Sequence, residues 1–396
     1  MAHMTTAAAP SREDLVRRAA DLVPLLRKHA VWQEENRHLH EEVVEGLADA
    51  GVLRLRVPAR FGGLEADTRT LNAVMAQIGR GDAAAAWTAS VWSIPGWMAG
   101  LFPEPVLQEV FSTPDVRVCG TLSPSARAVP VNGGMVVDGT WNFISGALHS
   151  HWQEILAMAP GPDLEDHPVV ALVPMSDLEI VDDWHVSGLR GSGSVTTVAK
   201  GVFVPQERIL PLPTVLAGRA ASPLNAASEM YRNPLVAVAN ASSAGTVLGM
   251  AEAAMEAFMD RVGERKITYT DYAHQRDAPI THIQVAEARL RIDRAWFHAD
   301  RMTQHADAKA AAGESWTIEE RARTRADIGS VCRLGKEAVD ILSLASGGSS
   351  IYTHVPMQRI ARDMQVINLH AINVPETNFE LYGRVLCGLE PNTPYV

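Results

Sequence analysis

The stretch DGTWNFISGALHSHW, residues 138–152, decides the fold of this chain. It brings aromatic side chains, a serine hydroxyl and two imidazoles together at the end of a run of β-forming residues. The sequence Asn132-Gly133-Gly134 just before that run is typical of a hairpin turn. We expect a β-strand that ends in a turn. Short apolar runs separated by turn residues continue on both sides, from about residue 116 to residue 213, so the stretch lies inside a β unit.

Helical patterns flank this β unit. Residues 12–30 and 40–55 repeat apolar side chains every three or four positions. The run from 70 to 102 is apolar enough to predict a buried helix, broken near Pro95. Helical periodicity returns from about 233 to 389. The chain is therefore predicted to be α+β and mostly α, with a cleft where the β unit meets the helices. The predicted domains are a helical domain at 12–113, a central antiparallel β-barrel or sandwich at 114–222, and a helical bundle at 223–396.

Composition narrows the range of partners. The chain has 396 residues, 47% of them apolar, and a net charge of −11, which argues against a nucleic-acid partner because such partners bind basic surfaces. No window reads as a membrane span, and the three cysteines show no metal-binding or paired spacing. The first 14 residues lack the apolar core of a secretory signal. We expect a cytoplasmic protein without a membrane partner or a bound metal.

Five stretches together carry a family resemblance: GTWNFISGALHSHW at 139–152, VSGLRGSGSVTTVAKGVFVP at 186–205, ERKITY at 264–269, ASGGSSIY at 345–352 and RIARDMQVINLH at 359–370. With the order helices, β unit, helices, they resemble the acyl-CoA dehydrogenase superfamily. Within it they are most similar to the two-component, reduced-flavin-dependent (group D) monooxygenases. The resemblance extends over nearly the whole chain after about residue 12. It implies an acyl-CoA dehydrogenase-like fold whose C-terminal part is a four-helix bundle.

The resemblance gives roles to the opening stretch. It implies that Phe143 lies against a flavin ring and that the Ser145 hydroxyl meets flavin N5, where a flat apolar wall and a neutral polar group suit the ring. Trp87, Trp92 and His149 are implied to face the substrate. The residues alone leave another interpretation open, in which Phe143 and the tryptophans fill the core and Ser145 bonds a backbone group.

A second implied catalytic residue is His370. Acyl-CoA dehydrogenases carry a glutamate base eight residues after an Arg-Asp pair such as Arg362-Asp363, and here that position is Ala371. A thioester α-proton needs a carboxylate base, and Glu376 is five residues further on. In the monooxygenase branch a histidine of this segment lies near the flavin and assists proton transfer, a role that suits an imidazole. From the residues alone, His370 could equally be a helix histidine bonded to a carbonyl.

Further residues are implied to hold the cofactor. An arginine reaches the pyrophosphate with its planar fork, and glycines let the backbone approach phosphate closely. A neighbouring subunit supplies part of this site, so a homotetramer is expected. The implied residues are Arg190, Ser192, Arg265, Gln284, Gly347 and Gly348.

No nicotinamide-binding or phosphate-binding loop occurs in the sequence, so the resemblance implies a separate flavin reductase. The implied cofactor is reduced FAD, with reduced FMN as the alternative, and dioxygen is the co-substrate. The implied reaction is hydroxylation of an aromatic, indole-type or polycyclic metabolite through a flavin C4a-hydroperoxide. Two alternatives stay open: an acyl-CoA dehydrogenase-like oxidoreductase with a relocated base, and a non-catalytic scaffold.

Overall fold

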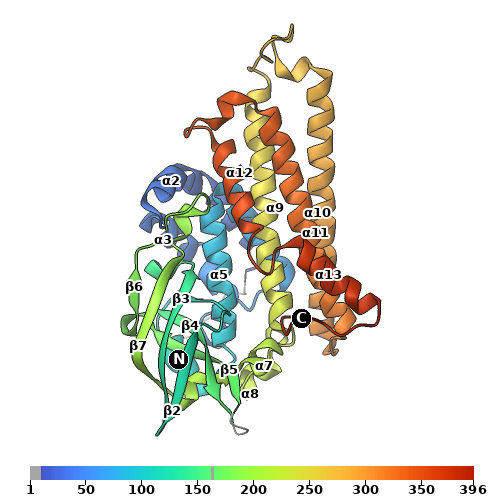
Figure 1. Ribbon diagram of the computed structural model, residues 1–396. Coiled ribbons are helices and arrows are strands. Elements are labelled where there is room, and N and C mark those ends of the chain that lie inside the picture. The colour runs from blue at the N-terminus through green and yellow to red at the C-terminus, as the bar shows by residue number, and fades with distance from the viewer. Residues whose placement is uncertain (1–9, 162–164) are drawn as a thin grey trace, which may run out of the picture.

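A computed structural model describes residues 10–161 and 165–396; residues 1–9 of the N-terminal stretch considered above lie outside this range. Figure 1 shows two helical parts with a β-sheet attached at one end of the long C-terminal helices. The predicted fold class is confirmed, because helices dominate and the strands occupy one central stretch of the chain.

The N-terminal part packs short helices around one buried helix. Its helices are α1 (Arg12–Asp21), α2 (Val23–Asn36), α3 (Glu41–Asp49), α4 (Thr68–Gly81), α5 (Ala83–Ala99) and α6 (Glu104–Val110). Helix α5 is buried on almost every side, as its composition predicts. The predicted break near Pro95 is wrong: α5 runs through this proline without interruption. The burial of α5 on almost every side compensates for the loss of the backbone hydrogen bond that a proline cannot donate.

The β part is one eight-stranded sheet in the order β6-β7-β3-β2-β4-β5-β8, with β1 paired to β4. Its strands are β1 (Val118–Gly120), β2 (Ala126–Val131), β3 (Gly134–Ile144), β4 (Trp152–Pro160), β5 (Asp166–Pro174), β6 (Glu179–Val181), β7 (Val195–Pro205) and β8 (Ile209–Pro211). The predicted Asn132-Gly133 turn joins β2 to β3. The prediction of a purely antiparallel unit needs correction, because β1 and β2 both pair with β4 in parallel. The chain therefore runs along the same edge of β4 twice, first as β1 and then as β2.

Two short helices, α7 (Leu212–Leu216) and α8 (Pro223–Ala227), lead into the C-terminal part. That part is a bundle of long helices, seen in yellow to red in Figure 1. Its helices are α9 (Leu235–Val262), α10 (Pro279–Ala312), α11 (Ile318–Ala345), α12 (Pro356–Ile367) and α13 (Pro375–Leu386). Among the described helices, none is both long and apolar enough to cross a membrane.

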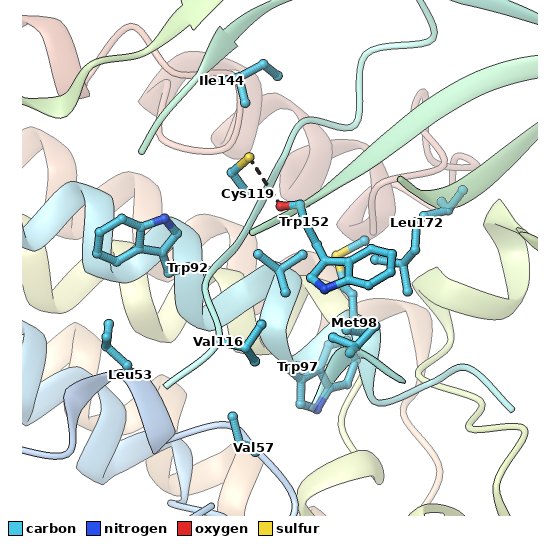
Figure 2. Packing of buried hydrophobic residues seen from close by; sticks show 14 of the residues in the cluster. Leu53, Val57, Trp92, Trp97, Met98, Val116, Cys119, Ile144, Trp152 and Leu172 are labelled. Carbon is cyan, nitrogen blue, oxygen red and sulfur yellow. Dashed lines mark hydrogen bonds between the residues drawn. The ribbon is translucent and has the colours of Figure 1, made fainter. Parts of the chain in front are cut away.

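A single apolar core joins the N-terminal helices to the sheet. Figure 2 shows Trp92, Trp97 and Met98 of α5 packed near Trp152 of β4 and Leu172 of β5. These side chains are buried. A second core holds the bundle together and includes Trp87 of α5 with Leu189 of the β part. Helix α5 therefore contributes to both cores, and the ends of the strands meet the bundle beside it.

Candidate functional site

The strand β3 ends in a strained, exposed position at Phe143. The pairing of β3 with β7 shifts between Trp141 and Ile144, so β3 carries one extra residue, a β-bulge. Phe143 has φ 64°, a conformation that costs a non-glycine residue about 1–2 kcal/mol. Its side chain is 69% exposed, and its ring lies edge-on to that of Trp184, with ring centroids 6.0 Å apart. A strained backbone that holds an aromatic ring in the open is typical of a binding site.

Two residues further on, Ser145 is buried in a network of hydroxyl groups. Its Oγ accepts a hydrogen bond from Trp87 Nε1 at 3.0 Å. The same Oγ lies 2.7 Å from Ser194 Oγ, which lies 2.7 Å from Ser192 Oγ. Ser192, predicted to bind the cofactor, thus reaches Ser145 through Ser194, a residue that the sequence interpretation did not select.

The same Trp87 contacts His370, so it joins the two residues predicted to be catalytic. The indole and imidazole centroids are 5.0 Å apart with an angle of 67° between the planes. Burial first, and the charge of Arg325 second, lower the pKa of His370 to about 4. Part of the residue is nevertheless open to solvent in the single chain. The imidazole is neutral at pH 7.

The turn at residues 188–194 is packed against three helices. A side chain at Gly188 would lie 2.5 Å from the Arg362 carbonyl of α12, and one at Gly191 would press on α2 and α5. Asp363 Oδ1 accepts from the Leu189 N–H at 2.6 Å. Arg190 forms no ion pair with any described residue, and its buried Nε has no hydrogen-bond partner among them. The turn therefore presents a cation that no described acid neutralises.

His149 and Trp92, both predicted to face the substrate, have protein partners instead. His149 Nε2 lies 3.0 Å from the Leu39 carbonyl, and its Nδ1 lies 3.5 Å from Glu41. Burial lowers the pKa of His149. Trp92 is buried and donates from Nε1 to Ser150 Oγ at 3.0 Å. Their predicted contact with a substrate stays a prediction.

Arg265 and Gly347, both predicted to hold phosphate, lie together beyond the C-terminal end of α9. Arg265 donates to the Ser346 carbonyl. A Cβ on Gly347 would lie 2.9 Å from Arg265 Nη2, and Gly347 has φ 61° with ψ −177°, a conformation open to glycine. Gly348 follows with no described atom within 4 Å of a built Cβ. Arg265 forms no ion pair among the described residues. Burial first, and the charge of the neighbouring Arg261 second, lower the pKa of Arg265.

A glutamine that contacts Arg265 within the chain is Gln275, and the predicted cofactor contact of Gln284 stays a prediction. Gln275 N–H donates to the Arg265 carbonyl at 2.5 Å, and its side-chain amide donates to the Ala345 carbonyl at 2.7 Å. Gln284 lies half-buried on α10. The segment after Arg265 does not continue as helix.

These features suit a flavin. An exposed aromatic wall, a buried hydroxyl with a spare lone pair and a cationic glycine turn match an isoalloxazine ring and a pyrophosphate. The ring site and the phosphate site are far apart within one chain. Ser90, one helical turn after Trp87 on α5, lies 2.5 Å from Ser242 of α9 between their hydroxyl oxygens, and Val262 at the end of α9 is about 30 Å further along the helix axis at 1.5 Å per residue. The five-carbon chain between a flavin ring and its first phosphate does not reach that far.

The first test of the ring site is Phe143→Gly. We expect the free energy of unfolding to rise by about 0.5–1 kcal/mol, because glycine relieves the left-handed strain at this bulge. Binding of reduced FAD should weaken at the same time, since the aromatic wall is lost. Urea unfolding and anaerobic flavin titration measure the two effects. A loss of stability would show that Phe143 supports the fold and not a ligand.

A second test uses the pH dependence of stability. Burial, aided by Asp82, raises the pKa of Asp363 to about 7, well above the value in an unfolded chain. Between pH 4 and 7 the folded chain keeps a proton that the unfolded chain has lost, so this group's contribution to stability is present at low pH and falls as pH rises. Asp363→Asn keeps an acceptor for the Leu189 N–H without titrating. Wild type should lose stability relative to this variant from pH 4.5 to 7.5, and a constant difference would contradict the shift.

Known proteins resemble the chain along its full length. Family models for the acyl-CoA dehydrogenase N-terminal and C-terminal domains match residues 13–101 and 241–375. The flavin-dependent monooxygenase oxygenase subunit HsaA of Mycobacterium tuberculosis is 31% identical over 95% of this chain and 96% of its own length. The FADH(2)-dependent resorcinol hydroxylase oxygenase component of a Rhizobium species is 29% identical over 96% of both chains. XiaF from Streptomyces, solved with FADH2 and glycerol, superposes with a TM-score of 0.93 at 28% identity, covering 97% of this chain and 98% of XiaF.

The fold and the site define a flavoprotein oxidoreductase of the acyl-CoA dehydrogenase type. Within that class, the chain belongs to the family of oxygenase subunits of two-component flavin-dependent monooxygenases.

Proposed function

We propose that this protein uses reduced FAD, or reduced FMN, and dioxygen to hydroxylate an aromatic, indole-type or polycyclic metabolite. The observation that carries the proposal is the contact of Trp87 with both Ser145 and His370 beside the exposed ring of Phe143. When bound, the reduced flavin supplies the activation of dioxygen and the oxygen atom that enters the substrate. The chain's residues bind and orient the two partners and keep water away.

Ser145 and Phe143 would hold the flavin ring. The Ser145 Oγ would meet N5, and the Phe143 ring, set by the bulge, would cover the ring plane. Arg190 would lie near the flavin and offer a positive charge that no described acid neutralises. The polar contact of Ser145 would thus lie at one edge of the flavin, and the apolar contact of Phe143 would lie on its face.

His370 would assist proton transfer at the substrate. With a pKa of about 4 the imidazole is neutral at pH 7, so it carries one N–H and one nitrogen lone pair. Its Nδ1 accepts from the Ile372 N–H at 3.4 Å, so the ring hydrogen lies on Nε2, which could donate a hydrogen bond to a phenol oxygen. Such a hydrogen bond would stabilise the phenolate form, whose negative oxygen raises the electron density of the ring that is to be hydroxylated.

The dehydrogenase alternative lacks its base. Ala371 stands where a glutamate would act, and Glu376 pairs with Arg333 on the surface at 2.8 Å. Neither residue offers a carboxylate to a thioester beside Ser145. The alanine at residue 371 therefore favours oxygenation over thioester dehydrogenation.

The distance between the ring site and Arg265 supports a homotetramer in which a neighbouring copy supplies the phosphate contacts of Arg265, Gly347 and Gly348. Helix α10 offers a surface for such an assembly. Ile283, Leu290 and Phe297, spaced seven residues apart on one face, are each about 60% exposed in the single chain.

The double variant Leu290→Glu/Phe297→Glu tests the assembly. It places two charges on the apolar face of α10, so the particle mass should fall to a dimer or a monomer while helical content stays unchanged. Light scattering coupled to size exclusion measures the mass. Retention of the wild-type mass would exclude this face as an interface.

We infer that a separate reductase delivers the flavin and that the protein works in the cytoplasm. Cys119, Cys332 and Cys387 are all free thiols, which suits a reducing compartment. Relatives named oxygenase subunit or oxygenase component support a separate reductase.

The proposed function is tested with purified protein, chemically reduced FAD or FMN, oxygenated buffer and a set of phenols and indoles, without any nicotinamide. Oxygen uptake that yields a hydroxylated product supports the proposal. Formation of hydrogen peroxide alone with every substrate contradicts it.

A further inference from the structure

The serine hydroxyls behind Ser145 form hydrogen bonds that run in one direction. Each hydroxyl has one proton to donate. The Leu189 carbonyl can only accept, so Ser192 directs its proton there at 2.7 Å. Ser192 must then accept from Ser194, and Ser194 in turn must accept from Ser145, each at 2.7 Å. The proton of Ser145 therefore points at Ser194.

Ser145 has no proton left for a ligand. The Trp87 indole N–H can only donate, and it occupies one lone pair of Ser145 Oγ at 3.0 Å. One lone pair remains, so Ser145 can meet a ligand only as an acceptor. It can accept a hydrogen bond from a ligand N–H, and its lone pair repels the lone pair of an unprotonated ligand nitrogen.

The base of this hydroxyl chain is held in place. Leu189 has φ 50°, its N–H is bonded to Asp363, and its carbonyl also accepts from Trp184 Nε1 at 3.2 Å. Gly193, between the two serines, has φ 53° and lies against the Arg37 carbonyl. A reversal would leave the Leu189 carbonyl with Trp184 as its only donor and would remove one hydrogen bond within the chain, so the protein favours this direction.

This step rests on the proposed function, in which Ser145 faces flavin N5. Reduced flavin carries a hydrogen on N5, and oxidised flavin carries a lone pair there. We propose that Ser192 and Ser194 are positioning residues that hold Ser145 as an acceptor and thereby make the site select reduced over oxidised flavin.

The test is the ratio of dissociation constants for oxidised FAD and for dithionite-reduced FAD under argon. Ser194→Ala frees the Ser145 proton to point at N5, so oxidised FAD should bind more tightly and the ratio should fall about 5- to 30-fold, the range of one hydrogen bond. Ser192→Ala should lower the ratio as well, because Ser194 can then donate toward Ser145. Ser93→Ala is the matched control, since the buried Ser93 hydroxyl bonds only the Ala89 carbonyl of its own helix. It should leave the ratio unchanged.

A measurement without variants keeps the test independent of folding. Reduced 5-deaza-FAD has carbon in place of N5 and offers no N–H, so wild type should bind it about 5- to 30-fold more weakly than reduced FAD. Equal binding of the two reduced flavins, or an unchanged ratio in folded Ser194→Ala, would overturn the role of the serines while the proposed function stood. Failure of wild type to bind either form of FAD would overturn the proposed function itself.

Discussion

His370→Ala should lower the rate of substrate hydroxylation by about 100-fold or more, the usual size of a lost acid–base group. The neutral imidazole beside Trp87 is the group that donates a hydrogen bond to the phenol oxygen in the proposed site. Oxygen uptake with reduced flavin should continue within a few-fold of wild type, because the flavin contacts of Ser145 and Phe143 are untouched. Hydrogen peroxide should then replace the hydroxylated product. Parallel assays of oxygen, peroxide and product measure how the consumed oxygen divides between peroxide and hydroxylated product.

The control for this prediction is His354→Ala. His354 is exposed and stacks on Tyr352 just before α12, whereas His370 follows the other end of that helix. Its removal should leave product formation unchanged. Equal loss of product in both variants, or full activity of His370→Ala, would remove His370 from the reaction.

Gly146→Ala should lower the free energy of unfolding by about 2–5 kcal/mol. Gly146 has φ 73°, which costs alanine about 1–2 kcal/mol. An added Cβ would also lie 2.5 Å from Trp92 Nε1 and 2.8 Å from Thr88 Cγ2, an overpacking that costs typically about 1–3 kcal/mol more. The Gly146 N–H donates to the Ser192 carbonyl, so flavin binding should weaken as well. Urea unfolding measures the first effect.

Gly133→Ala is the matched control, because it separates strain from overlap. Gly133 has φ 82° in the β2–β3 turn, and no described atom lies within 4 Å of a built Cβ there. It should therefore lose only about 1–2 kcal/mol, the cost of the left-handed conformation. An equal loss in the two variants would show that Trp92 does not press on Gly146.

The fold class and the family were predictable from the sequence, because they depend on the order of local patterns and on stretches such as 138–152. Strand partners were not predictable. Local alternation identifies β1, β2 and β4, but pairing of β1 and β2 with the same edge of β4 is a long-range choice. The helix through Pro95 is a case where burial overrides a local rule.

The site was predictable only in part, since residue type does not give side-chain direction. Trp92 and His149 have the right chemistry for a substrate wall, but the structure turns them toward Ser150 and Leu39. Ser194 gave no signal in the sequence beyond its place in the glycine-rich turn. The roles of Ser145 and His370 stay predictions that their shared contact with Trp87 supports.

The most direct measurement of the central claim is a structure of the assembled protein with reduced FAD bound under anaerobic conditions. We expect flavin N5 within about 3 Å of Ser145 Oγ, the ring against Phe143, and the pyrophosphate at Arg265 of a neighbouring copy. A flavin bound elsewhere, or one whose N5 makes no contact with Ser145, would contradict the account.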